Sequence, residues 1–302
     1  MVNLRTRYVL GVSAVVVGAI ALSFTGLIMR QVEVADAWQV LFFRAIGMIA
    51  TMSVFMLITQ RGRVVSGIRG VGWRGIAVAI LVGPSFGFYI LALTMSSVAE
   101  VSFVISTLPL FTALLAWVFL RERIRVSTWV AIFVVLVGVA IMVVDSIGQS
   151  GGALGILVAF GVPTTFAATI VLIRAGRDVD MVPATWMAGF VSLIMAVALM
   201  GGSLEGVPAS DMGWGLLMGC TLGFGFGLYT VGARHVTAAQ VALLALLEQA
   251  FNPVWAWAGA GETPTVLVLI GGLIVFGAVV YRAVAGVREE RSQPARVPVE
   301  GD

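Results

Sequence analysis

The sequence predicts an all-α integral membrane protein of ten transmembrane helices, arranged as two five-helix repeats that cross the bilayer in opposite senses. First, 60% of the 302 residues are hydrophobic, only 11% are charged and the mean hydropathy is +1.07, a composition that cannot cover a water-soluble domain. Second, apolar segments of the roughly 20 residues needed to cross a bilayer recur along the chain. Third, the two halves resemble each other. Helices are expected because each satisfies its own backbone hydrogen bonds, and the alternation of a barrel strand is absent.

Ten apolar segments are separated by short connections that contain Gly, Pro and Arg. The predicted helices are Tyr8–Met29, Ala37–Ile58, Trp73–Thr94, Val98–Leu120, Thr128–Val144, Ala153–Ile173, Pro183–Met200, Asp211–Gly232, Ala238–Ala258 and Pro264–Ala285. The first is too long for the apolar core of a signal peptide and is interpreted as the first span. The repeats are therefore expected over residues 1–146 and 147–286. A polar tail over 287–302 is expected to be disordered and cytoplasmic.

The internal repeat is clearest between residues 89–122 and 229–262. An internal repeat is sought before any fold is assigned, because it determines the architecture. When Tyr89 is aligned with Tyr229 and no gap is introduced, the two copies have identical residues at several positions. Among these are Phe86/Phe226, Gly87/Gly227, Tyr89/Tyr229, Ala99/Ala239, Val101/Val241, Ala116/Ala256, Trp117/Trp257 and Glu122/Glu262. The copies differ at one central position, where Leu108 in the first half corresponds to Glu248 in the second.

The arginines predict the orientation of the helices. Lysine is absent, and with the N-terminus inside, all arginines except Arg30 and Arg44 fall in or beside the inner connections. This bias is the one described by the positive-inside rule, so both termini are expected in the cytoplasm. Because each repeat contains an odd number of helices, the second copy is inverted. Glu122 is then cytoplasmic and Glu262 external.

Glu248 is the first candidate site residue. It lies about ten residues into its helix, which is ~15 Å by helical rise and close to the bilayer centre. A carboxylate there is costly unless it is protonated, paired or facing water. Asn252 and Trp255 follow on the same helix face, and Gln249 adjoins the acid. These four residues are predicted to contact a solute or a coupling proton; alternatively, the carboxylate only fixes helix packing.

Four further candidates lie in other predicted helices. Arg44 is embedded about 10 Å from the outer end of its helix, where it is expected to bind a substrate carboxylate, to pair with Glu248 or to snorkel outward. Tyr89 and Tyr229 are repeat-related phenols that either line a cavity or pack. Ser106 belongs to a stripe of small side chains that is either a cavity wall or a close helix contact.

Two features receive structural interpretations. Gly215, Gly219 and Gly223 recur at every fourth residue, a spacing that permits close helix approach or, alternatively, a sliding surface. Glu262 is interpreted as leading into the last helix, with Thr263 as its N-cap and a proline at its first position.

The residue inventory excludes several kinds of chemistry. His235 is the only histidine and Cys220 the only cysteine, so neither a His-based dyad, a disulfide nor a thiolate metal site is supported. A phosphate-binding loop of the G-x-x-x-x-G-K-[ST] type requires a lysine, which the chain lacks. No catalytic residue, metal, cofactor or nucleic-acid partner is therefore predicted.

Three segments resemble the EamA-type family of the drug/metabolite transporter superfamily. They are L-F-F-R-A around Arg44, A-L-T-M-S-S-V-A-E-V-S-F-V-I-S-T-L-P-L-F-T-A-L-L-A-W-V-F-L-R-E-R, and L-L-E-Q-A-F-N-P-V-W-A-W-A-G-A-G-E-T-P. The resemblance covers nearly the whole chain except the tail. It implies two inverted halves, a central cavity lined by the third, fourth, eighth and ninth helices, and ATP-independent movement of small solutes. Gln249 departs from the first repeat, which has Pro109 at the matching place.

These observations predict a secondary transporter, and not an enzyme, that exports small metabolites such as amino acids across the bacterial inner membrane by alternating access. Its expected partners are a small-molecule solute, the lipid bilayer and protons as the coupling ion. One alternative is an intramembrane lipid-modifying enzyme, which would need clustered acids, metal ligands or a nucleophile with a base. The other is a non-transporting membrane scaffold, which would leave the embedded Glu248 and Arg44 unexplained.

Overall fold

The structure is a computed structural model that describes residues 4–59, 70–121, 126–146, 152–175, 181–201, 204–232, 235–236 and 238–292. Over these ranges the regular structure is α-helical. The helices are α1 (Leu4–Ser23), α2 (Thr25–Met29), α3 (Ala37–Thr59), α5 (Gly72–Met95), α6 (Val98–Ile105), α7 (Leu108–Leu120), α8 (Val126–Ser146), α9 (Gly152–Ala159), α10 (Gly161–Ala175), α11 (Met181–Leu199), α12 (Ala209–Gly232), α13 (Ala238–Ala260) and α14 (Val266–Ser292).

The ten predicted helices are present, and eight of them qualify as membrane spans. Each of the ten predicted segments is helical over most of its length, and within the described residues eight helices are long and apolar enough to cross a membrane. The apolar stretch Val266–Tyr281 of α14 is shorter. α14 continues past the predicted end at Ala285 to Ser292, whereas residues 293–302 of the predicted tail lie outside the described part of the chain. Most connections that carry the inner arginines also lie outside it.

Three helices that the sequence predicts as continuous are each divided in two. Phe24 separates α1 from α2, Ser106 and Thr107 separate α6 from α7, and Phe160 separates α9 from α10. Ser23 and Thr25 flank the first break, and each hydroxyl donates to the carbonyl three residues earlier at 2.7 Å. The hydroxyls of Ser106 and Thr107 do the same at 2.6 Å. Side chains that bond back to the preceding turn compete with the helical ladder and bend it.

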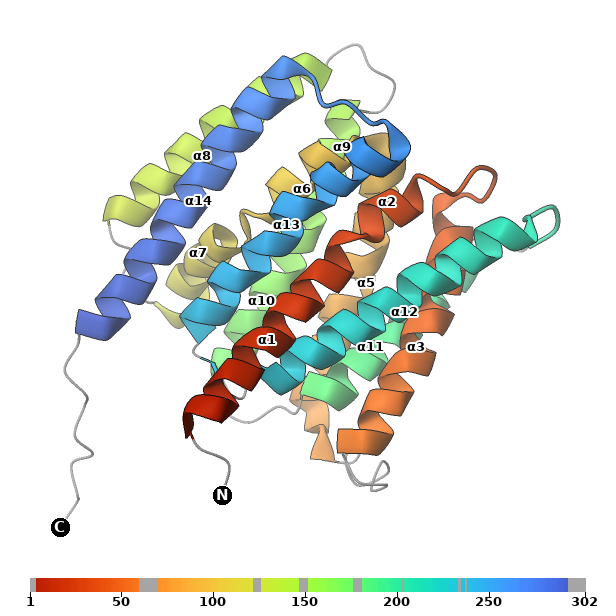
Figure 1. The fold of residues 1–302 in the computed structure, drawn as a ribbon, viewed down its shortest axis with the longest axis horizontal. Helices are drawn as coiled ribbons and strands as arrows, with labels where there is room; N and C mark the ends of the chain where they lie inside the picture. Colours follow the sequence, from red (N-terminus) through yellow and green to blue (C-terminus); the bar gives the residue numbers. More distant parts are fainter. Residues whose placement is uncertain are drawn as a thin grey trace.

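The helices form one bundle with a separate outer pair (Figure 1). Successive neighbours around the bundle are α13 with α1, α1 with α12, α12 with α3, α3 with α11, α11 with α5, and α5 with α10. α8 and α14 pack on each other at the left of Figure 1. The beginning of α1 and the end of α14 lie at the same end of the bundle, and α2 lies toward the other end.

Glycines bring α12 close to α3, which confirms the predicted close approach. A Cβ added to Gly215 would lie 2.7 Å from the Cβ of Phe43, and one added to Gly223 would lie 2.8 Å from the Cβ of Thr51. At Gly219 the added atom would collide with the backbone carbonyl of Arg44. The α12 glycines therefore fix the helix that carries this arginine.

A second glycine crossing joins α8 to α14. A Cβ on Gly271 would lie 2.5 Å from the carbonyl oxygen of Gly138, and one on Gly138 would lie 2.6 Å from the carbonyl oxygen of Gly271. Small residues let membrane helices approach in this way. The outer pair is therefore held by direct backbone contact.

We expect Gly271→Val to force this pair apart and lower the free energy of unfolding by about 1–3 kcal/mol, the range for overpacking. Gly277→Val is the matched control, because Gly277 is on the same helix and an added Cβ meets nothing within 4 Å. Thermal unfolding in detergent measures both variants. Equal shifts in melting temperature would contradict this account of the crossing.

Candidate functional site

Asn252 is the centre of a buried hydrogen-bond cluster that joins three helices. Its side chain on α13 is fully buried. Its Nδ2 donates to the Tyr89 hydroxyl on α5 at 3.0 Å, and its Oδ1 accepts from the Gly26 amide on α2 at 2.9 Å. Two of the predicted site residues, Asn252 and Tyr89, are thus in direct contact.

Trp255 ties the same face of α13 to the break between α1 and α2. Its Nε1 donates to the Ser23 hydroxyl at 2.9 Å. Its ring stacks on Phe24, with centroids 4.9 Å apart, and on Phe251, with centroids 5.8 Å apart. These contacts give Trp255 a packing role, while its predicted contact with a solute stays a prediction.

Arg44 is buried among aromatic rings. Its side chain on α3 is 2% exposed, so it does not snorkel to the surface. Its Cζ lies 5.4 Å from the ring centroids of both Phe86 and Tyr89, a favourable position for a cation over an aromatic face. Its Nη1 donates to the Phe86 carbonyl at 3.3 Å, whereas its Nε has no partner among the described residues.

Glu248 is half-buried on α13 and belongs to the same electrostatic environment. Its carboxyl group interacts electrostatically with the Arg44 guanidinium and with the phenols of Tyr89 and Tyr229. Within the described ranges, no ion pair of 4.0 Å or less joins it to Arg44. A direct pair with Glu248, one of the three alternatives for Arg44, is therefore absent from this structure, and the two charges act on each other over a longer distance.

Four buried polar atoms lack a hydrogen-bond partner within the described part of the chain. They are Arg44 Nε, Ser102 Oγ, Tyr229 Oη and Gln249 Oε1, on α3, α6, α12 and α13 respectively. Buried polar groups are normally paired, and an unsatisfied one costs about 1–3 kcal/mol. Three of the four residues were predicted as site residues. The fourth, Ser102, lies one helical turn before Ser106 in the same stripe of small side chains.

Ser106 is placed differently from the other candidates. It ends α6, and its hydroxyl is used within its own turn by donation to the Phe103 carbonyl. No described hydrogen bond joins it to Asn252 or Arg44. Ser102, one turn earlier, is the serine of this stripe whose hydroxyl stays unpartnered.

Aromatic rings from α5, α10 and α12 border the site. Phe86 and Phe226 meet edge to face with centroids 6.0 Å apart, and Phe166 stacks on Phe226 at 6.1 Å. Tyr229 in turn contacts Phe226 at 6.4 Å. The Arg44 guanidinium therefore lies at the edge of an apolar, aromatic wall.

We expect Asn252→Ala to lower the free energy of unfolding by about 2–3 kcal/mol, because it leaves the Gly26 amide and the Tyr89 hydroxyl unpaired in the interior. Tyr89→Phe removes only one of the two hydrogen bonds and should cost about 1 kcal/mol. Unfolding in a detergent and denaturant series compares the variants. A Tyr89→Phe loss as large as that of Asn252→Ala would contradict the central role of Asn252.

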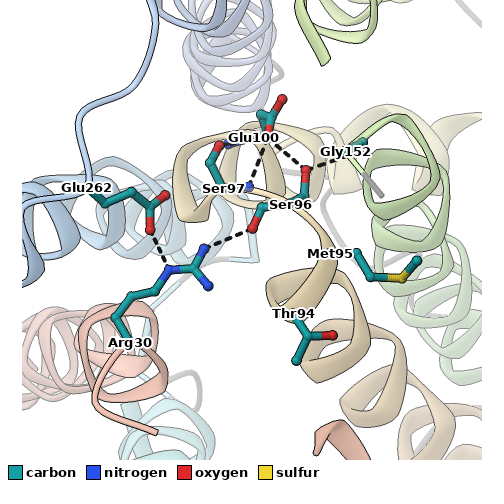
Figure 2. A pocket seen from close by; sticks show the side chains of 8 residues that line it. All are labelled: Arg30, Thr94, Met95, Ser96, Ser97, Glu100, Gly152 and Glu262. Atoms are coloured by element: carbon teal, nitrogen blue, oxygen red, sulfur yellow. Dashed lines mark hydrogen bonds and ion pairs between the residues drawn. The ribbon is translucent and has the colours of Figure 1, made fainter. Parts of the chain in front are cut away.

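A second polar assembly, which was not predicted from the sequence, lies at the α2 end of the bundle. An open pocket of about 380 Å³ is lined there by Arg30, Glu262, Glu100 and the serines between α5 and α6. Figure 2 shows the Arg30 guanidinium between Glu262 and Ser96. Arg30 Nε donates to Glu262 Oε2 at 2.5 Å. The predicted placement of Arg30 and Glu262 on the same side of the membrane agrees with this contact.

The interpretation of the chain around Glu262 was wrong about the start of the last helix. α14 begins at Val266, and the Thr265 hydroxyl accepts from the Val268 amide at 3.2 Å. Thr265 therefore caps the helix instead of Thr263. Residues 261–265 form a non-helical connection, which leaves Glu262 outside the helix and able to reach Arg30. Its repeat partner Glu122 lies outside the described residues.

Comparisons with known proteins agree with this architecture. The chain is 26% identical over 275 residues to the pseudopaline exporter CntI from two strains of Pseudomonas aeruginosa, covering 88% of this chain and 93% of the relative. It is 24% identical over 217 residues to the uncharacterized transporter YdfC of Bacillus subtilis, covering 68% of this chain and 70% of the relative. A solved crystal structure at 18% identity has the same fold, with a TM-score of 0.62 over 95% of this chain and 99% of the other.

The family comparison covers both halves of the molecule. The model of the EamA-like transporter family matches residues 9–144 and again residues 153–282. These two matches span nearly all of the described helices. The chain is therefore an integral membrane protein that belongs to the EamA-like transporter family.

Proposed function

We propose that this protein is a secondary transporter that exports a small zwitterionic metabolite, such as an amino acid, across the bacterial inner membrane. Family membership supports transport over an enzymatic or purely structural role. Similarity to a protein named as an exporter supports the outward direction. The observation that carries the proposal is a buried arginine in a membrane-spanning helix, near an acid but not paired with it. Embedded charges of this kind are costly and mark solute or proton pathways.

The polar groups of the cluster suit a solute that carries one negative and one positive group. The Arg44 guanidinium can bind a carboxylate with two parallel hydrogen bonds. Glu248 and the unpartnered carbonyl oxygen of Gln249 can accept from an ammonium group. The hydroxyls of Ser102 and Tyr229 supply further polar contacts, and Phe86 offers an apolar face to the rest of the solute. A zwitterion would pair both protein charges at once, which lowers the penalty of burying them.

The transport mechanism we propose is alternating access between two inverted five-helix repeats. The family match in each half supports the repeat. The contact between the repeat partners Phe86 and Phe226 is consistent with a pseudo-twofold axis through the site. Both termini would lie in the cytoplasm, and Glu248 is the group that would take up the coupling proton.

Purified protein in liposomes tests this function. The solute panel contains amino acids, pseudopaline, nucleosides and cationic drugs, each measured for uptake and efflux with a pH gradient of either sign. We expect protein-dependent flux of at least one zwitterion that responds to the gradient, and none in empty liposomes. Flux restricted to cations would contradict the zwitterionic site. Solute movement that never depends on the protein would favour the scaffold or the enzyme.

A further inference from the structure

Arg30 forms a three-way junction at the α2 end of the bundle. Besides its contact with Glu262, its Nη1 donates to the Leu93 carbonyl at 2.7 Å and its Nη2 donates to the Ser96 carbonyl at 2.8 Å. All three guanidinium nitrogens therefore have partners. Together they join the end of α2, the connection after α13 and the end of α5.

Glu262 extends the junction to α6. Its Oε1 accepts from the Val98 amide, the first residue of α6, at 2.6 Å, while its Oε2 holds Arg30. Gly261 ends α13 with φ of +69°, a conformation that glycine adopts without strain, and the Glu262 amide bonds back to the Ala256 carbonyl at 3.2 Å. The carboxylate is thus anchored to α13 and spans to the corner between α5 and α6.

The junction is linked to the central site through two helices. α13 carries Asn252 and leads directly into Glu262, and α2 carries Gly26 and ends at Arg30. Gly26 bonds to Asn252 and Arg30 bonds to Glu262. On α6, Ser102 lies one turn below Val98 on the same face. Its hydroxyl is buried and has no hydrogen-bond partner within the described part of the chain.

We propose that Arg30 and Glu262 form the outer gate of the transport pathway, and that this structure is its closed state. The inference rests on the proposed function, because a gate needs a pathway. Separation of the pair would free α2 and α13 from the α5–α6 corner and expose Ser102 and the Asn252 cluster to the outer face. The open pocket beside the pair gives water and solute access to it from that side.

The exposure of the pair suits a gate that opens reversibly. The Arg30 and Glu262 side chains are 26% and 20% exposed. Ion pairs that water reaches contribute little to stability, and their partners can be rehydrated as they separate. A buried pair would leave uncompensated charges on opening, which is strongly unfavourable.

Cysteine labelling tests the gate without a known solute. Cys220 is the only cysteine, so Cys220→Ser gives a background into which Ser102→Cys is introduced as the reporter. A membrane-impermeant methanethiosulfonate is added to right-side-out vesicles and the labelling rate is measured. We expect Glu262→Gln and Arg30→Gln to raise the rate at least tenfold. Arg30→Lys, which keeps the positive charge beside Glu262, should stay closer to the parent value.

Asp145→Asn is the matched control, because it removes an acid that bonds Thr265 at the same end of the bundle but outside the junction. Its labelling rate should equal that of the parent. An unchanged rate in both gate variants would overturn the gate. A protein that shows the tenfold increase yet moves no solute in liposomes would contradict the proposed function and would leave the pair as the closure of a water-accessible cavity, not the gate of a transport pathway.

Discussion

Replacing Arg44 with glutamine is expected to reduce the initial rate of transport at least about 100-fold while leaving the protein folded. The guanidinium is the only buried cation placed over the Phe86 and Tyr89 rings, among the residues that the structure describes. Loss of one partner from a desolvated charge pair costs about 2–5 kcal/mol, and each 1.4 kcal/mol is about tenfold. Arg44→Lys keeps the positive charge but loses the planar guanidinium that can bind a carboxylate in a bidentate way, so an intermediate rate is expected.

Arg74→Gln is the control for Arg44. Arg74 is also an arginine within a membrane helix, but it lies near the start of α5, over the exposed Trp73 ring. Its transport rate should stay within about twofold of the parent, because a cation over an exposed ring contributes only about 0.5–1 kcal/mol. Rates are compared in liposomes that contain equal amounts of folded protein. An Arg44→Gln variant with the parent rate would remove this arginine from the site.

Gly219→Leu is expected to give the largest loss of stability, about 3 kcal/mol or more. The added Cβ would meet the Arg44 carbonyl and would lie 2.8 Å from the Met48 amide nitrogen, so α12 and α3 must separate. Backbone atoms cannot move aside as a flexible side chain can. The displaced helix is the one that carries Arg44, so transport should be lost together with stability.

Gly213→Leu provides the comparison on the same helix. An added Cβ at Gly213 meets nothing within 4 Å, and leucine is a better helix former than glycine by about 1 kcal/mol. This variant should be as stable as the parent or slightly more so. Melting temperature and the monodisperse fraction after size-exclusion chromatography measure both variants. A Gly219→Leu protein as stable as Gly213→Leu would contradict the close packing of α3 and α12.

The membrane helices could be predicted from the sequence because their apolar length is set by the bilayer. The breaks within three of these helices could not be predicted in this way. The break at Phe24 has no proline or glycine at the broken position itself, and it depends on hydroxyls that bond back to the preceding turn and on the Asn252 contact to Gly26. The contact between Asn252 and Gly26 cannot be predicted from local sequence, because the two residues are far apart in the chain.

The central site was partly predictable for a related reason. Glu248, Asn252 and Arg44 were recognised because polar side chains within apolar helices are conspicuous. Which partners they meet depends on helix packing, so the Asn252–Tyr89 bond and the absence of a direct Arg44–Glu248 pair required the structure. Arg30 and Glu262 lie at helix ends, where charges are ordinary, and nothing local distinguishes them from solvated residues.

The central claim is that Arg44, Glu248 and the polar groups around them form the solute site of a transporter. The most direct test is the transport rate of Glu248→Gln in liposomes across a range of pH. The variant keeps the size of the side chain and removes its charge and its proton. Glu33→Gln, in the exposed connection after α2, is the matched control. We expect Glu248→Gln to lose at least about 99% of the rate and its pH dependence, since a positioned proton-transferring side chain contributes about 100-fold or more. A Glu248→Gln protein that inserts normally and transports at the parent rate at every pH would contradict the claim.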